Sequence, residues 1–189
     1  MKYDPDRYHR RSIRLKDYDY SWTGAYFVTI CVYERRCLFG GVEQGEMRLN
    51  PPGMMVANIW QDLNRRFPGV KTDARVVMPN HVHGIIWLVG APLVGALDEG
   101  IRATTRVGNH KGCPFTVGDV IGAFKSITAD EYIDEVKRND WPPFSGRVWQ
   151  RNYHEHVIHN AGALQAIRDY IEANPSQWAT DPENPERNR

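Results

Sequence analysis

The stretch MPNHVHGII, residues 78–86, joins a turn signal to an apolar run that carries two histidines. Proline and asparagine are typical of turns, and β-branched residues are typical of strands. Because strand side chains alternate between two faces, His81 and His83 point the same way, roughly 6 to 7 Å apart, while Val82 points the other way. Such a pair can hold a divalent metal ion, or it can be two ordinary half-buried histidines beside a turn.

The regions around this stretch alternate between strand and helix patterns. Strands are predicted over 25–33, 72–78, 81–89 and 148–158, and the glycines of 38–49 suit a short hairpin. Helices are predicted after Asn50, ending at Pro68-Gly69, and over 116–136 and 161–173. This order predicts an α+β fold, with helices packed on an antiparallel sheet.

The composition predicts one folded domain. The chain has 189 residues, 41% of them hydrophobic, and a formal net charge of +1. We divide it into a basic N-terminal arm over 1–22, a domain over 23–178 and a polar tail over 179–189. The glycine-rich loop 90–114 is long enough to be either functional or disordered. The arm can contact phosphates or can be a solvated tail of mixed charge.

Cysteine usage and apolar content predict a cytoplasmic protein. Three cysteines form no CxxC pair, which favours free thiols in a reducing compartment. No apolar signal region follows the first charges, and prolines and glycines interrupt the uncharged stretch 76–97. We therefore expect no membrane span.

A second pair of candidate residues lies in RDYIEANPSQW, residues 168–178. Tyr170 and Asn174 are four residues apart, so they are neighbours on one helical face and can both reach the histidines if that face covers the sheet. Asn174 can instead simply end the helix before Pro175, and Tyr170 can pack beside apolar neighbours.

Several separated motifs carry a resemblance to a known family. In order they are RRSIRLKDYDYSWTGAYFVTICV, MPNHVHGII, GAFKS, VWQRNYHEHVI and YIEANPSQW. Together they resemble the REP-associated tyrosine transposases, which are single-tyrosine members of the HUH nucleases. The resemblance runs from about residue 11 to residue 178, nearly the whole chain, and is far more specific than an isolated HxH.

The resemblance implies a ferredoxin-like sandwich that cuts single-stranded or hairpin DNA of repeated extragenic elements. It makes Tyr170 the nucleophile and His81, His83 and Asn174 the metal ligands. The metal would be Mg²⁺ or Mn²⁺, and the product a 5′-phosphotyrosine with a free 3′ hydroxyl. The implied partner is DNA, and members of this group are expected to act as monomers.

Basic residues are the candidates for contacts with a polyanionic partner. Arg10, Arg11 and Arg14 lie in the arm, and binding through them should weaken with salt. Lys125 in GAFKS can contact a phosphate or can be an exposed helix lysine.

Three alternatives stay open at this stage. His154 and His156 form a second HxH, in which we interpret His156 as a near-site or structural residue and His154 as solvent-facing. The chain can be a non-catalytic protein that binds hairpins and regulates repeats. It can also be an unrelated metal hydrolase that uses water and a carboxylate such as Asp73 or Glu155.

Overall fold

The computed structural model describes residues 22–89 and 113–187, and over them the predicted α+β fold is confirmed. The strands are β1 (Gly24–Cys31), β2 (Gly40–Glu43), β3 (Glu46–Leu49), β4 (Val70–Val77), β5 (His81–Leu88) and β6 (His154–Ile158). The α-helices are α1 (Pro51–Arg66), α2 (Val117–Asn139) and α3 (Ala161–Ala173), with short 3₁₀ turns η1 (Tyr33–Arg35) and η2 (Pro175–Thr180).

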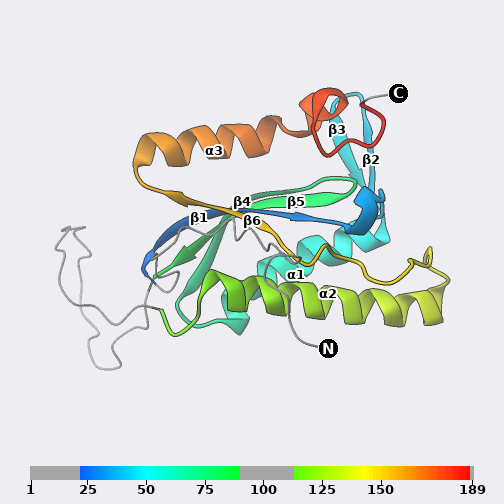
Figure 1. Ribbon diagram of the computed structural model, residues 1–189, viewed down its shortest axis with the longest axis horizontal. Coiled ribbons are helices and arrows are strands. Elements are labelled where there is room, and N and C mark those ends of the chain that lie inside the picture. The colour runs from blue at the N-terminus through cyan, green and yellow to red at the C-terminus, as the bar shows by residue number, and fades with distance from the viewer. Residues whose placement is uncertain (1–21, 90–112, 188–189) are drawn as a thin grey trace, which may run out of the picture.

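The main sheet is antiparallel throughout, in the order β4-β5-β1-β6, and β2 and β3 form a separate hairpin. Leaving the hairpin aside, the elements up to β6 follow the βαββαβ order of ferredoxin-like folds. Figure 1 shows α3 on one face of the sheet and α1 and α2 on the other. The first and last helices therefore cover opposite sides of β5.

Alternation along β5 divides its side chains between two cores. Val82 and Ile86 join the larger core, which includes Trp60 of α1 and Phe124 of α2. Ile85 joins the smaller core, which includes Ile171 of α3. The histidines share the parity of Ile85, so they belong to the α3 face, as the strand pattern predicts.

Gly84 allows α1 to lie close to the sheet. A Cβ atom at this position would lie 2.3 Å from the nearest Trp60 side-chain atom, well inside van der Waals contact. The residue between the histidine pair and the apolar end of β5 therefore has to be a glycine for Trp60 to pack there.

The predicted helix starts are confirmed. The Asn50 side chain accepts a hydrogen bond from the Gly53 N–H at the start of α1. Thr116 and Asp119 form a reciprocal capping box at the start of α2. Such caps satisfy backbone donors that have no partner within the helix.

One predicted strand is too long. Residues 148–158 were expected to be extended throughout, but β6 begins at His154. Trp149 makes only an isolated bridge to Val32, and Gln150, Arg151 and Asn152 direct their carbonyls to the Lys125 ammonium instead of to a neighbouring strand.

Two predicted regions lie outside the described residues. They are the arm with Arg10, Arg11 and Arg14, and nearly all of the loop 90–114. In the part of the chain that is described, no helix has the length and apolar character needed to cross a membrane.

Candidate metal and tyrosine site

The structure brings the four predicted site residues together on the α3 face of the sheet. The ring centroids of His81 and His83 lie 4.5 Å apart, and the Tyr170 hydroxyl is 3.3 Å from His83 Nε2. Tyr170 lies in the last turn of α3, and Asn174 is the residue at which the helix ends. Asn174 therefore ends the helix, and its side chain also lies beside His81 and Tyr170; its role as a metal ligand stays a prediction.

His83 is oriented by a threonine on the neighbouring strand. Thr29 of β1 pairs directly with His83 of β5, and its Oγ1 lies 2.8 Å from His83 Nδ1. If Nδ1 carries the proton, it donates to the hydroxyl and leaves Nε2 as a lone pair that faces Tyr170. A hydrogen bond on one ring nitrogen commonly fixes a metal-binding histidine in this way.

His81 is oriented by Asn80, the residue before it. The Asn80 Nδ2 donates to the carbonyls of Arg35 (3.0 Å) and Glu183 (2.7 Å), so its Oδ1 is the atom 2.9 Å from His81 Nδ1. His81 Nδ1 must then be the N–H donor, because an amide oxygen only accepts. In the neutral ring Nε2 is therefore an unprotonated acceptor, and it is buried with no hydrogen-bond partner in the described residues.

Both rings are held neutral by burial. Desolvation lowers the pKa of His81, although the nearby Asp181 carboxylate raises it in part. Desolvation also lowers the pKa of His83 well below its ordinary value, and the repulsion that a proton on His81 would exert adds to this effect. A metal ion binds the neutral form of imidazole, so neither histidine has to lose a proton first near pH 7.

Two further oxygen atoms complete the cluster. Asn174 Oδ1 is buried with no hydrogen-bond partner in the described residues. The carboxylate of Asp181, which directly follows η2, lies with one ligand atom from each histidine in a group whose members are all within 4.8 Å of one another. The sequence interpretation missed Asp181, because an aspartate in a polar, proline-containing tail carries no periodic signal.

The donor set fits a divalent metal ion. Two imidazole nitrogens, a carboxylate and an amide oxygen present lone pairs toward one another, and no described N–H or O–H satisfies His81 Nε2 or Asn174 Oδ1. Two buried acceptors without a donor are costly unless a cation lies beside them. These nitrogen and oxygen donors suit several divalent ions, so the ligands alone do not select one metal.

Tyr170 combines access to solvent with contact to the cluster. Its side chain is 40% exposed, and its ring lies against those of His83 and Phe27, at centroid distances of 5.3 and 6.0 Å. Partial burial raises the pKa of the phenol, and the Asp181 charge raises it further, while the Asn174 side chain lowers it. The hydroxyl is therefore protonated at neutral pH and accessible to a substrate.

The other predicted candidates have partners elsewhere. Lys125 donates to the carbonyls of Gln150, Arg151 and Asn152 at 2.9–3.3 Å, which uses its three donors. Its predicted DNA contact stays a prediction.

Asp73 and Glu155 are the carboxylates considered for an unrelated metal hydrolase, and neither belongs to the cluster of metal-ligand atoms. Asp73 is paired with Arg168 and accepts from Trp87 Nε1, and Glu155 accepts from the Tyr153 hydroxyl.

The second histidine pair lies on the edge strand of the same face. His154 and His156 of β6 pair with Thr29 and Phe27 of β1, and both are exposed. The predicted exposure of His154 is confirmed. His156 is exposed rather than buried, and its ring contacts that of His159 at 6.4 Å between centroids, so its interpretation as a near-site or structural residue stays a prediction.

Comparison with solved structures defines the class of fold. The chain shares its fold with a REP-associated tyrosine transposase solved bound to a REP hairpin, at a TM-score of 0.52 and 19% identity, over 87% of this chain and 73% of that one. A structure described as a candidate transposase from Deinococcus radiodurans R1 is also similar, at a TM-score of 0.45 and 17% identity, over 84% of this chain and 95% of that one. The likeness to the first of these structures confirms, at the level of the fold, the resemblance read from the sequence motifs.

Sequence comparison places the chain in a family. An uncharacterized protein of Haemophilus influenzae (strain Rd) is 37% identical over 180 residues, which cover 95% of this chain and 96% of that protein. The chain belongs to the same family as this protein. No family model matches the chain.

Proposed function

We propose that this protein is a metal-dependent endonuclease and strand transferase of transposase type, which cuts single-stranded, hairpin-associated DNA through Tyr170. The observation that carries the proposal is the position of the exposed Tyr170 hydroxyl, 3.3 Å from His83 Nε2. It lies beside buried His81 Nε2 and Asn174 Oδ1 atoms that have no hydrogen-bond partner in the described residues. A protein that only binds DNA has no need of such a cluster beside an accessible phenol.

The residues take the following roles in this proposal. His81, His83 and Asn174 would hold Mg²⁺ or Mn²⁺, which when bound would supply Lewis-acid chemistry at a phosphate oxygen. Tyr170 Oη gives its proton to water, attacks phosphorus and forms an oxygen–phosphorus bond. The bond from phosphorus to the 3′ oxygen breaks, so the 5′ phosphate stays on the tyrosine and the 3′ oxygen leaves as a hydroxyl after it takes up a proton.

Support for DNA as the partner comes from the fold. The solved transposase that shares it is bound to a REP hairpin, and we propose hairpins of repeated extragenic elements as substrates of this chain as well. Arg10, Arg11 and Arg14 are the proposed phosphate contacts of the N-terminal arm. We also propose that the protein acts in the cytoplasm and as a monomer.

The test is a covalent adduct on a denaturing gel. The full chain is incubated with Mn²⁺ and labelled single-stranded hairpins from repeats beside its own gene. We expect a protease-sensitive protein–DNA band that disappears in Tyr170→Phe and persists in Tyr33→Phe, which removes the same hydroxyl at a position outside the cluster. Salt-sensitive hairpin binding without any adduct would contradict the proposal and favour a regulatory binding protein.

The Asp181 carboxylate favours one alternative function, a metal hydrolase that uses water as the nucleophile. Two histidines and an aspartate are also a common ligand set of metal hydrolases that use water as the nucleophile. Such an enzyme would still cut DNA after Tyr170→Phe and would leave no protein on the product, so the same gel separates the two mechanisms.

A further inference from the structure

The C-terminal segment over 174–187 carries a buried carboxylate whose charge no described cation balances. Asp181 is 6% exposed, and its Oδ1 accepts a hydrogen bond of 2.6 Å from the Glu183 N–H. Its Oδ2 is 4.0 Å from His81 Nε2, too far for a hydrogen bond. Within the described ranges no lysine or arginine forms a salt bridge with it. A buried carboxylate in this position is costly unless a cation lies beside it.

Three lone-pair atoms come from different elements: His81 Nε2 lies 4.0 Å from Asp181 Oδ2, and the Asn174 side chain lies within hydrogen-bonding reach of His81. His81 Nε2 comes from β5, Asn174 Oδ1 from the end of α3, and Asp181 Oδ2 from the residue after η2. All three residues are buried, and all three atoms are acceptors, so they cannot satisfy one another. Two ligands at ordinary metal–nitrogen and metal–oxygen distances of about 2.1 Å can lie up to about 4.2 Å apart, which accommodates the separation of His81 from Asp181.

We infer that Asp181 is a ligand of the metal centre and that the C-terminal segment is therefore part of that centre. The inference rests on the proposed metal-dependent function and adds a charged ligand to the two histidines and Asn174. The carboxylate lowers the net charge of the occupied site by one and should bind the ion more tightly than neutral ligands alone.

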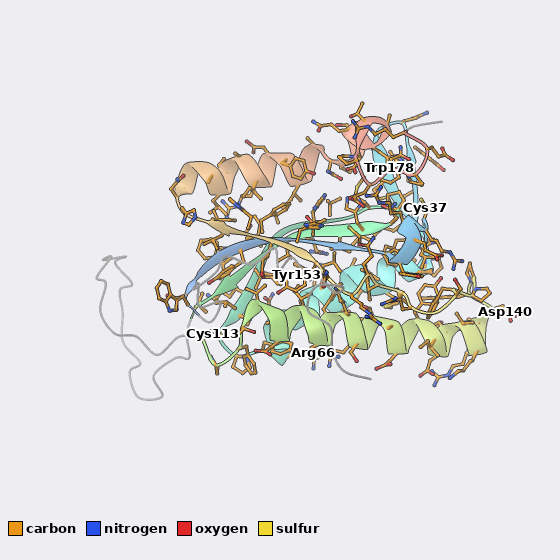
Figure 2. All side chains as sticks on the ribbon, viewed as in Figure 1. Cys37, Arg66, Cys113, Asp140, Tyr153 and Trp178 are labelled. Atoms are coloured by element: carbon orange, nitrogen blue, oxygen red, sulfur yellow. The ribbon has the colours of Figure 1, made fainter. Side chains whose placement is uncertain are left out.

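The contacts of the segment explain how it reaches the site. Figure 2 shows Trp178 on the side of η2 that faces the sheet, and its ring centroid is 6.1 Å from that of His81. The Glu183 carboxylate pairs with Arg35 at 3.0 Å. The Glu183 carbonyl accepts from Asn80, whose oxygen accepts in turn from His81.

Asn80 thus connects the segment to a metal ligand through one side chain. Metal binding and docking of the segment are therefore thermodynamically linked. If Asp181 binds the metal ion, docking of the segment makes metal binding more favourable. The bound ion must then stabilise the docked segment by the same free energy.

The first experiment measures Mn²⁺ affinity of the full chain by titration calorimetry. We expect Asp181→Asn, which keeps the size but removes the charge, to weaken binding roughly 10- to 100-fold. Glu186→Gln is the matched control, because it removes the same charge from an exposed position of the same segment. Equal affinities of Asp181→Asn and Glu186→Gln, within twofold, would overturn the inference.

The second experiment measures hydrogen exchange of the segment with and without Mn²⁺. In the wild type and in Glu186→Gln, Mn²⁺ should slow exchange over 176–184 at least several-fold, and this protection should be absent in Asp181→Asn. Unchanged exchange in the wild type at saturating Mn²⁺ would overturn the linkage without reliance on any variant.

The outcomes separate this inference from the proposed function. If the wild type binds Mn²⁺ and His81→Ala does not, while Asp181→Asn binds normally, the metal centre stands and Asp181 is not a ligand. If the wild type itself binds no Mn²⁺, the metal-dependent function and the inference both fail.

Discussion

The two HxH pairs have the same spacing and lie on the same face of one sheet, yet their surroundings differ in every respect that matters for metal binding. Thr29 lies between them, paired with His83 on one side and His154 on the other. His81 and His83 occupy a central strand and are buried, whereas His154 and His156 occupy the edge strand and are exposed. The spacing places two rings on one face in both pairs, but only the central pair also has the burial and the oriented partners that favour metal binding.

The two histidine pairs also differ in the hydrogen bonds that orient their rings. In the central pair Asn80 and Thr29 each engage an Nδ1 atom, which directs Nε2 toward the cluster. No described hydrogen bond orients the ring of His154 or His156. A ring without such a partner keeps both tautomers and several rotamers, so it loses more entropy when it binds an ion.

The largest expected effect is the loss of metal binding on removal of either ring of the central pair. Loss of a residue that only hydrogen-bonds to a metal ligand weakens metal binding roughly 10- to 100-fold. His81→Ala or His83→Ala removes a ligand itself, so each should weaken Mn²⁺ binding by more than this and should abolish the DNA adduct. His154→Ala and His156→Ala should leave the Mn²⁺ affinity within twofold of wild type. Calorimetry measures both sets, and loss of binding in the edge-strand variants alone would reverse the assignment.

A smaller effect is expected when only the orientation of one ring is lost. Thr29→Val keeps the shape of the side chain but removes the hydroxyl that lies 2.8 Å from His83 Nδ1. We expect Mn²⁺ affinity to fall roughly tenfold, which is the low end of the effect of removing a residue that hydrogen-bonds to a metal ligand. Thr72→Val, on a strand of the same sheet, is the control and should bind as wild type. An unchanged affinity in Thr29→Val would show that His83 needs no such partner.

The sequence predicted the elements that carry the site better than it predicted how they meet. Period-2 alternation was enough to place His81 and His83 on one face, and period 3.6 was enough to align Tyr170 with Asn174. Both patterns are local, and both are confirmed. Spacing did not separate the two HxH pairs, and the preference for His81 and His83 came from the resemblance to a family. Which strand lies at the sheet edge is a property of long-range pairing, so no local pattern shows it.

The residues that sequence reasoning missed act through tertiary contacts. Asp181 lies in a polar segment that appears peripheral until η2 brings it against β5. Asn80 fits an ordinary turn position, and only its bonds to Arg35 and Glu183, distant in sequence, show that its oxygen faces His81. Lys125 appeared free for a ligand, but carbonyls 25 to 27 residues away occupy it.

The smallest expected effect is a difference between the pairs in how the metal-free protein responds to acid. Burial first, and the charge of His81 second, lower the pKa of His83 in the folded chain. Below pH 6.5 the unfolded chain therefore takes up a proton at this position that the folded chain does not, so the free energy of unfolding falls as the pH falls. The loss is at most about 1.4 kcal/mol for each pH unit and each such group.

Urea denaturation in EDTA at pH 7.0 and 5.5 measures this difference. His83→Gln removes the titrating ring, so its unfolding free energy should fall less between the two pH values than that of the wild type. His154→Gln removes an exposed ring from the same face, and its fall should equal that of the wild type. If the two variants behave alike, burial does not distinguish the pairs electrostatically, and only the orientation of their rings can account for selective metal binding.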